Sequence, residues 1–87
     1  MPKIKKKLII NNKQGLHARP AATFVQLANK FESKIVLKKD GDAVSGKSIM
    51  GILMLAAEKG SEIVIEADGA DAQEAVAELE ALVNKDE

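Results

Sequence analysis

Two spacings of apolar residues alternate along the 87-residue chain and predict its elements. Lys3–Ile10 alternates imperfectly, with Ile4, Leu8 and Ile10 on one face and Lys6 interrupting it, which predicts a strand at the edge of a sheet. From Ala18 the apolar residues recur every three or four positions, which predicts a helix whose apolar side is closed by Phe31. Pro20 falls in the first turn of this helix, where its missing N–H breaks no intrahelical bond.

The middle of the chain predicts a hairpin followed by a short helix. Ser33–Lys38 alternates, Asp40-Gly41 is a turn signal, and Ala43–Gly46 forms the returning strand. Ser48 is a favourable N-cap for the apolar segment that ends at Leu55. Since this segment is apolar on nearly every side, one core cannot bury it completely, and we expect part of it to be exposed; Ile52 and Leu55 are the expected core residues.

The last third predicts one more strand and a final helix. Glu62–Ala67 alternates, so that Glu66 is among the residues expected to face away from the core. Asp71 and Glu74 have the spacing of an acidic capping box, and Ala72–Val83 carries an apolar helical stripe that includes Leu82. The core-facing residues of the strand are Ile63, Ile65 and Ala67.

The element order, β-α-β-β-α-β-α, predicts an α+β fold: an open-faced sandwich in which three helices cover one face of a four-stranded antiparallel sheet. The length predicts a single domain over residues 1–87. No apolar run is long enough to cross a bilayer, and the short run in 8–10 has no cleavage site after it, so we expect a cytoplasmic protein without signal peptide or membrane insertion. Without cysteine there is no disulfide framework.

Charge is distributed unevenly, although the formal net charge is zero. Up to Asp40 ten basic residues oppose two acidic ones, and from Gly41 onward three basic residues oppose eleven acidic ones. The basic part is either a surface for an acidic partner or a set of solvent-facing lysines on an edge strand. A fold that intermingles the two halves would also cancel the asymmetry.

The only histidine and the only arginine of the chain, His17 and Arg19, stand at the start of the first predicted helix. A helix N-terminus has unpaired amides and a partial positive charge, so it favours anions. The same dipole disfavours a charged imidazole, and a neutral imidazole is a nucleophile toward a phosphoryl donor. The amides of Ala18 and Arg19 and the Arg19 guanidinium are expected to hold the resulting phosphate.

Other interpretations of His17 remain open from the residues alone. A single histidine at a helix start is often only a surface or capping residue. Metal binding finds little support, because one histidine and no cysteine leave only carboxylates as further ligands. Ser-His-Asp catalysis is compatible with the composition, but no nucleophile-elbow pattern is present.

Two motifs carry a resemblance to a known family. "GLHARPAA", residues 15–22, resembles the active-site motif of the histidine-containing phosphocarrier proteins (HPr) of the bacterial sugar phosphotransferase system. "KSIMGILMLA", residues 47–56, resembles the second signature of that family, around its regulatory serine. The resemblance covers nearly the whole chain and implies the same element order.

The resemblance implies that enzyme I phosphorylates His17 on Nδ1 and that the group passes to IIA domains of sugar permeases. Arg19 would bind the phosphoryl group, no cofactor would be needed, and the protein would be a carrier rather than an enzyme. Ser48 matches the serine modified by HPr kinase/phosphorylase, and the modified form would meet a catabolite-control transcription regulator. The alternative is that Ser48 only caps its helix.

A partner-docking patch follows from the same resemblance and from the excess of apolar residues in the second helix. We expect it beside His17, with a monomeric protein presenting it to each partner in turn. Methionine suits a surface that meets several partners. The expected docking residues are Ala18, Ala22, Gln26, Ile49, Met50 and Leu53.

Three other functions compete with this one. A paralogue in a nitrogen-related or purely regulatory phosphorelay would use the same His17 chemistry. A module acting only through phosphorylated Ser48 is disfavoured, because paralogues of that kind lack the active histidine. Nucleic-acid binding is not expected, because only two aromatic residues are present and both are expected in the first helix.

Overall fold

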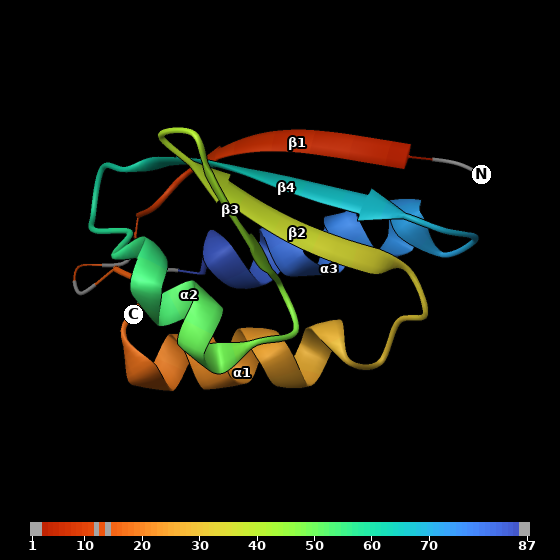
Figure 1. Ribbon diagram of the computed structural model, residues 1–87, viewed down its shortest axis with the longest axis horizontal. Helices are drawn as coiled ribbons and strands as arrows, with labels where there is room; N and C mark the ends of the chain where they lie inside the picture. Colours follow the sequence, from red (N-terminus) through yellow and green to blue (C-terminus); the bar gives the residue numbers. More distant parts are fainter. Residues whose placement is uncertain (1–2, 12, 14, 86–87) are drawn as a thin grey trace.

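The computed structural model of the chain describes residues 3–11, 13 and 15–85, and its seven elements follow the predicted order (Figure 1). The strands are β1 (Lys3–Ile9), β2 (Lys34–Lys39), β3 (Asp42–Ser45) and β4 (Glu62–Asp68). The helices are α1 (Ala18–Ala28), α2 (Ile49–Leu55) and α3 (Ala72–Val83). No helix within these ranges is both long and apolar enough to cross a membrane.

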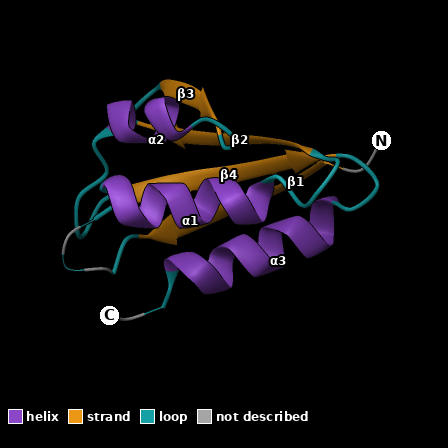
Figure 2. Cartoon of the chain, turned by 90° about the horizontal axis from the view of Figure 1, so that it is seen from below, coloured by secondary structure: helices purple, strands orange, loops and turns teal. Residues whose placement is uncertain are grey.

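The sheet has the strand order β1-β4-β2-β3, and every neighbouring pair is antiparallel. The three helices lie on one side of it, which Figure 2 shows from below, so the predicted open-faced α+β fold is confirmed. The β2–β3 hairpin turns at Asp40 and Gly41, both with positive φ (52° and 87°), the backbone that a two-residue Asp-Gly turn favours.

The core lies between the sheet and the helices, and alternation places it correctly. Ile63, Ile65 and Ala67 of β4 are fully buried, and Ile52 and Leu55 of α2 are buried as predicted. Phe31 is also buried, but it lies beyond the end of α1. It therefore contributes to the core from the following turn rather than from the helix.

Glu66 of β4 corrects one expectation. It projects from the open face as predicted, yet only 6% of the residue is exposed. Its carboxylate lies 2.7 Å from Lys38 Nζ, 3.5 Å from Lys3 Nζ and 3.8 Å from Lys5 Nζ. The hydrogen bond from Lys38, aided by the positive charge of all three lysines, lowers the pKa of Glu66. The basic β1 is thus neutralised in part by the acidic β4 beside it.

The predicted capping box at the start of α3 is wrong. Asp71 occupies the N-cap position, but its side chain makes no capping bond, and its backbone (φ −103°, ψ 22°) is not extended. Its carboxylate instead accepts hydrogen bonds from the Glu32 amide (2.9 Å), the Ser33 amide (3.0 Å) and the Ser33 hydroxyl. These bonds, the Ser33 hydroxyl first, lower the pKa of Asp71 and join the turn after α1 to the start of α3.

Candidate functional site

His17 is the N-cap residue of α1, with an extended backbone (φ −85°, ψ −167°). Its carbonyl accepts the first helical hydrogen bond, from Ala21 N at 2.9 Å. Its imidazole makes no capping bond, so the side chain is not occupied by the helix it begins. His17 therefore holds the expected N-cap position without capping the helix through its side chain, and the residue is half-buried.

The two residues before His17 hold it against the end of α2. Leu16 is buried, and its amide donates to the Ala57 carbonyl at 2.8 Å. Gly15 has a φ of +69°, and a Cβ there would collide with the backbone of Ala57 and Glu58. Only glycine tolerates both the backbone conformation and this close approach. "GL" in the motif therefore positions His17.

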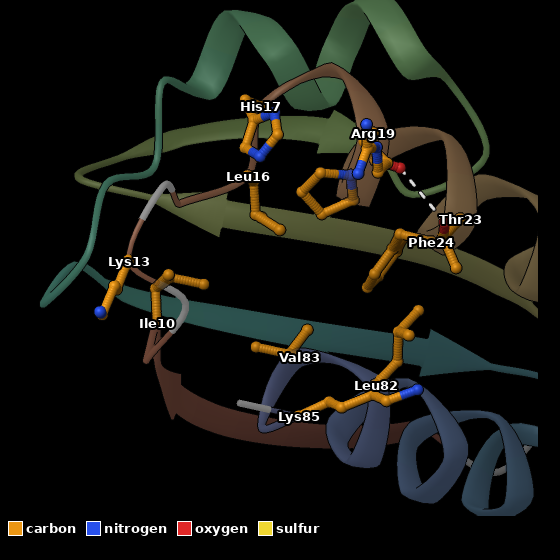
Figure 3. A pocket seen from close by; sticks show the side chains of 11 residues that line it. Ile10, Lys13, Leu16, His17, Arg19, Thr23, Phe24, Leu82, Val83 and Lys85 are labelled. Atoms are coloured by element: carbon orange, nitrogen blue, oxygen red, sulfur yellow. Dashed lines mark hydrogen bonds between the residues drawn. The ribbon is translucent and has the colours of Figure 1, made fainter. Parts of the chain in front are cut away.

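Arg19 stands in the first turn of α1 and shares a cavity with His17 (Figure 3). Arg19 is exposed. Its backbone carbonyl accepts a hydrogen bond from Thr23 Oγ1 at 3.2 Å. Helix geometry leaves the amides of the first turn without an intrahelical acceptor. An anion attached to the imidazole would lie at this helix end, in the cavity that Arg19 also lines; that Arg19 and these amides bind it stays a prediction.

The cavity itself, about 330 Å³, lies between the start of α1 and the end of α3. Sequence reasoning missed its contribution from Lys13, Thr23 and Lys85, and it placed Leu82 only in a core-facing stripe, whereas this residue is half-buried at the cavity. No local pattern signals these residues, because three separate segments supply them. The described parts of the chain hold no group of three or more side chains suited to a metal ion.

Ser48 lies on a different element and does not line this cavity. Its hydroxyl accepts a hydrogen bond from the Gly51 amide at 3.0 Å, so the predicted N-cap of α2 is confirmed. The neighbouring Lys47 donates from Nζ to the Phe31 carbonyl at 2.7 Å. This bond ties the residues before α2 to the turn that follows α1.

The residues expected at a docking patch are distributed over α1 and α2, which pack against each other. Ile49 and Met50 are 41% and 67% exposed, whereas Leu53 is half-buried against the core. Met54, which the sequence reasoning passed over, is 77% exposed. On α1, Ala18 and Gln26 are exposed and Ala22 is half-buried. The structure thus exposes an apolar surface on α2, as the excess of apolar residues predicts.

The chain is similar to known phosphocarrier proteins in sequence and in fold. The family model described as "PTS HPr component phosphorylation site" matches residues 4–85. A phosphocarrier protein HPr of Neisseria meningitidis is 48% identical over 81 residues, covering 93% of this chain and 91% of that protein. The crystal structure of a phosphocarrier protein HPr from Bacillus anthracis superimposes with a TM-score of 0.91 at 49% identity, covering 94% of this chain and 98% of that one.

A second type of relative is about equally similar. The HPr-like protein Crh of Bacillus subtilis is 47% identical over 83 residues, covering 95% of this chain and 98% of its own. A crystal structure of Crh superimposes with a TM-score of 0.78 at 46% identity, covering 97% of each chain. That protein is described as a catabolite repression protein that forms a domain-swapped dimer.

Proposed function

The chain belongs to the HPr family of the bacterial phosphotransferase system, and on this premise we propose that it carries a phosphoryl group on His17 from phospho-enzyme I to the IIA domains of sugar permeases. The observation that carries the proposal is the imidazole of His17, which makes no capping bond and shares a cavity with Arg19. The protein would be regenerated in each cycle, so it is a carrier rather than an enzyme, acting in the cytoplasm without a cofactor.

The proposed step is an exchange of one bond to phosphorus for another. The lone pair of His17 Nδ1 attacks the phosphorus of the donor, and the P–N bond forms as the bond to the donor breaks. The Arg19 guanidinium and the amides of Ala18 and Arg19 stabilise the anionic oxygens. In transfer to the IIA domain, the P–N bond to His17 breaks as a bond from phosphorus to the acceptor forms.

Phosphorylation by enzyme I and phosphoenolpyruvate tests this proposal. Intact mass should show one added phosphoryl group, acid should remove it, and His17→Ala should lack it. Because the imidazole makes no capping bond, this variant should lose no more than about 1 kcal/mol of stability. Ser48→Ala is the matched control and should accept the group normally. Retained acceptance by folded His17→Ala would contradict the assignment.

Ser48 is proposed as a regulatory site for an HPr kinase/phosphorylase. Its position as N-cap of α2 places it directly before the exposed Ile49 and Met50. A phosphate there would add negative charge to the docking surface without opposing the helix dipole. Ser48→Asp should slow His17 phosphorylation by enzyme I, while Ser48→Ala should not; equal rates would contradict the proposal.

Enzyme I and the IIA domains are proposed to bind one surface of this protein, made of the apolar residues of α2 and the exposed side of α1. Exposed methionine and isoleucine next to half-buried Leu53 support it. Met50→Glu should weaken the complex with enzyme I, and Lys30→Glu, at the far end of α1, should not. The proposed residues are Ala18, Ala22, Gln26, Ile49, Met50 and Leu53.

A regulatory role is the second candidate, favoured by the similarity to Crh at 47% identity beside 48% for HPr. In that role, phosphorylated Ser48 would bind a catabolite-control transcription regulator; a nitrogen-related phosphorelay would use His17 with another donor. Measuring which enzyme I, the sugar type or the nitrogen type, phosphorylates His17 separates these two branches.

Light scattering decides whether the chain is the predicted monomer or a dimer such as Crh forms.

A further inference from the structure

The cavity between α1 and α3 has an apolar wall that phosphoryl transfer does not use. Ile10, Leu16, Phe24 and Val83 are buried, and half-buried Leu82 stands at the cavity. In Figure 3, Leu82 and Val83 rise from α3 toward the ring of Phe24 on α1. An apolar group of a ligand would therefore find aliphatic and aromatic contacts on two helices.

Besides His17 and Thr23, the polar side chains described in the lining of the same cavity are the cations Lys13, Arg19 and Lys85. Lys13 comes from the loop before α1, Arg19 from its first turn, and Lys85 from just beyond α3. No carboxylate lines the cavity among the described residues, and the ion pairs found there do not include these three side chains. Three cations beside an apolar wall complement a ligand that is anionic at one end and apolar at the other.

We propose that this cavity binds a small organic phosphate whose body is an aromatic ring or a short branched alkyl chain. The body packs between Phe24 and Leu82, and the phosphate meets Arg19, while Lys13 and Lys85 add positive charge at opposite sides of the cavity. The volume of about 330 Å³ is at the low end of small-molecule sites, which limits the body to about one ring.

Binding of such a ligand competes with phosphorylation of His17, and this part rests on the proposed function. A phosphoryl group on His17 would place its charge in the cavity that holds the ligand phosphate, and both would need Arg19. The ligand therefore prefers the unphosphorylated protein. By linkage, the factor by which phosphorylation weakens ligand binding is also the factor by which bound ligand lowers the equilibrium constant for phosphorylation of His17. The site would make the carrier sensitive to a metabolite.

Binding is tested by titrating isotope-labelled, unphosphorylated protein with phenyl phosphate and following the amide resonances. Inorganic phosphate and phenol are the control ligands, since each contains only one part of phenyl phosphate, the phosphate or the ring. We expect shifts at Phe24, Leu82 and Val83, and a dissociation constant at least about tenfold lower for phenyl phosphate than for inorganic phosphate. Equal affinities, or shifts confined to the first turn of α1, would overturn the proposal.

Three variants locate the probe. Leu82→Trp fills the cavity and should weaken phenyl phosphate binding more than about tenfold, and Lys85→Gln about threefold. Lys30→Gln, an exposed lysine outside the cavity, should change nothing. If Leu82→Trp does not fold, Leu82→Ala removes the same wall and should weaken binding severalfold. Unchanged affinity in the folded Leu82 variant would contradict the site.

The competitive part has its own readout. The phosphorylated protein should bind phenyl phosphate at least about tenfold more weakly than the unphosphorylated protein. Equal binding by both forms would contradict competition at this site. Failure of enzyme I to phosphorylate the chain would instead contradict the proposed function, and the titrations of unphosphorylated protein would still decide whether the cavity binds its ligand.

Discussion

The open face of the sheet and the end of the molecule around His17 are both rich in basic residues, but among the described residues only the open face pairs its lysines with acidic side chains. On the sheet, Lys3, Lys5 and Lys38 surround the buried carboxylate of Glu66. Around His17, by contrast, the described lining of the cavity contains cations and no carboxylate.

This difference shows that a count of charges does not locate a binding site. β1 carries four lysines, and every one of them pairs with an acid: Lys3 and Lys5 with Glu66, Lys6 with Glu80, and Lys7 with Glu62. Sheet pairing of β1 with β4 brings the basic and acidic halves of the chain together. The interpretation in which the fold intermingles the basic and acidic halves therefore accounts for these lysines, without a surface reserved for an acidic partner.

The largest expected contrast is in the rate of phosphoryl transfer. Arg19→Gln should slow onward transfer from phosphorylated His17 on the order of 100-fold, because it removes a charged donor from the phosphoryl oxygens. Lys38→Gln removes equal charge from the sheet and should leave the rate unchanged. Rapid-quench measurements on both variants test the contrast. Equal slowing in both would mean that overall charge, rather than the His17 end, governs transfer.

Stability should show the opposite pattern. Glu66→Gln leaves three lysines without their shared carboxylate and should lower the Tm clearly, whereas Arg19→Gln should leave it nearly unchanged. Differential scanning calorimetry at neutral pH measures both. Glu62→Gln, which disturbs a pair with both side chains exposed, is the control. A Tm for Glu66→Gln equal to that of the control would remove Glu66 from its structural role.

Acidification should reduce stability through the same carboxylate. The pKa of Glu66 is lowered from its ordinary value of 4.5, chiefly by the Lys38 hydrogen bond, and that of Asp71 from 3.8, chiefly by the Ser33 hydroxyl. Both contributions are present above the ordinary values and are lost as the pH falls through the lowered ones. Denaturant titrations between pH 6 and pH 2 (about four units) should therefore show a smaller acid loss for Glu66→Gln than for the wild type. An identical pH profile would contradict this linkage.

The smallest effect is expected at the exposed rim of the sheet. Lys7→Gln breaks the pair with Glu62, whose side chains are 68% and 55% exposed, and should cost less than about 0.5 kcal/mol of unfolding free energy. High salt should remove even that difference. Urea unfolding at low and high ionic strength measures it. A loss as large as that of Glu66→Gln would mean that burial does not distinguish the two pairs.

Local sequence rules succeeded where the deciding contacts lie within a few residues. Ser48 was predicted as an N-cap, and its hydroxyl bonds the Gly51 amide. Asp40-Gly41 was predicted as a turn, and both residues have the positive φ it requires. His17 was placed at a helix start by Pro20 and the apolar period that follows.

The same rules failed where a distant segment competes. Asp71 and Glu74 have capping-box spacing, but the Asp71 carboxylate bonds residues 32 and 33 across the structure. Glu66 alternates correctly, but lysines from β1 and β2 bury it. Both arrangements depend on residues from other segments, so the pattern within one turn or one strand does not predict them.

What the sequence by itself determined is the set of elements, the Ser48 cap of α2, the Asp40-Gly41 turn, and the placement of His17 and Arg19 at the start of α1, because hydrogen bonds between near neighbours and apolar periodicity decide these. Only the tertiary structure decided which charges cancel and where a cavity forms. The pairing of β1 with β4 sets the first, and the approach of the end of α3 to the start of α1 sets the second. Both depend on contacts between residues far apart in the chain, which exist only after the helices have packed on the sheet.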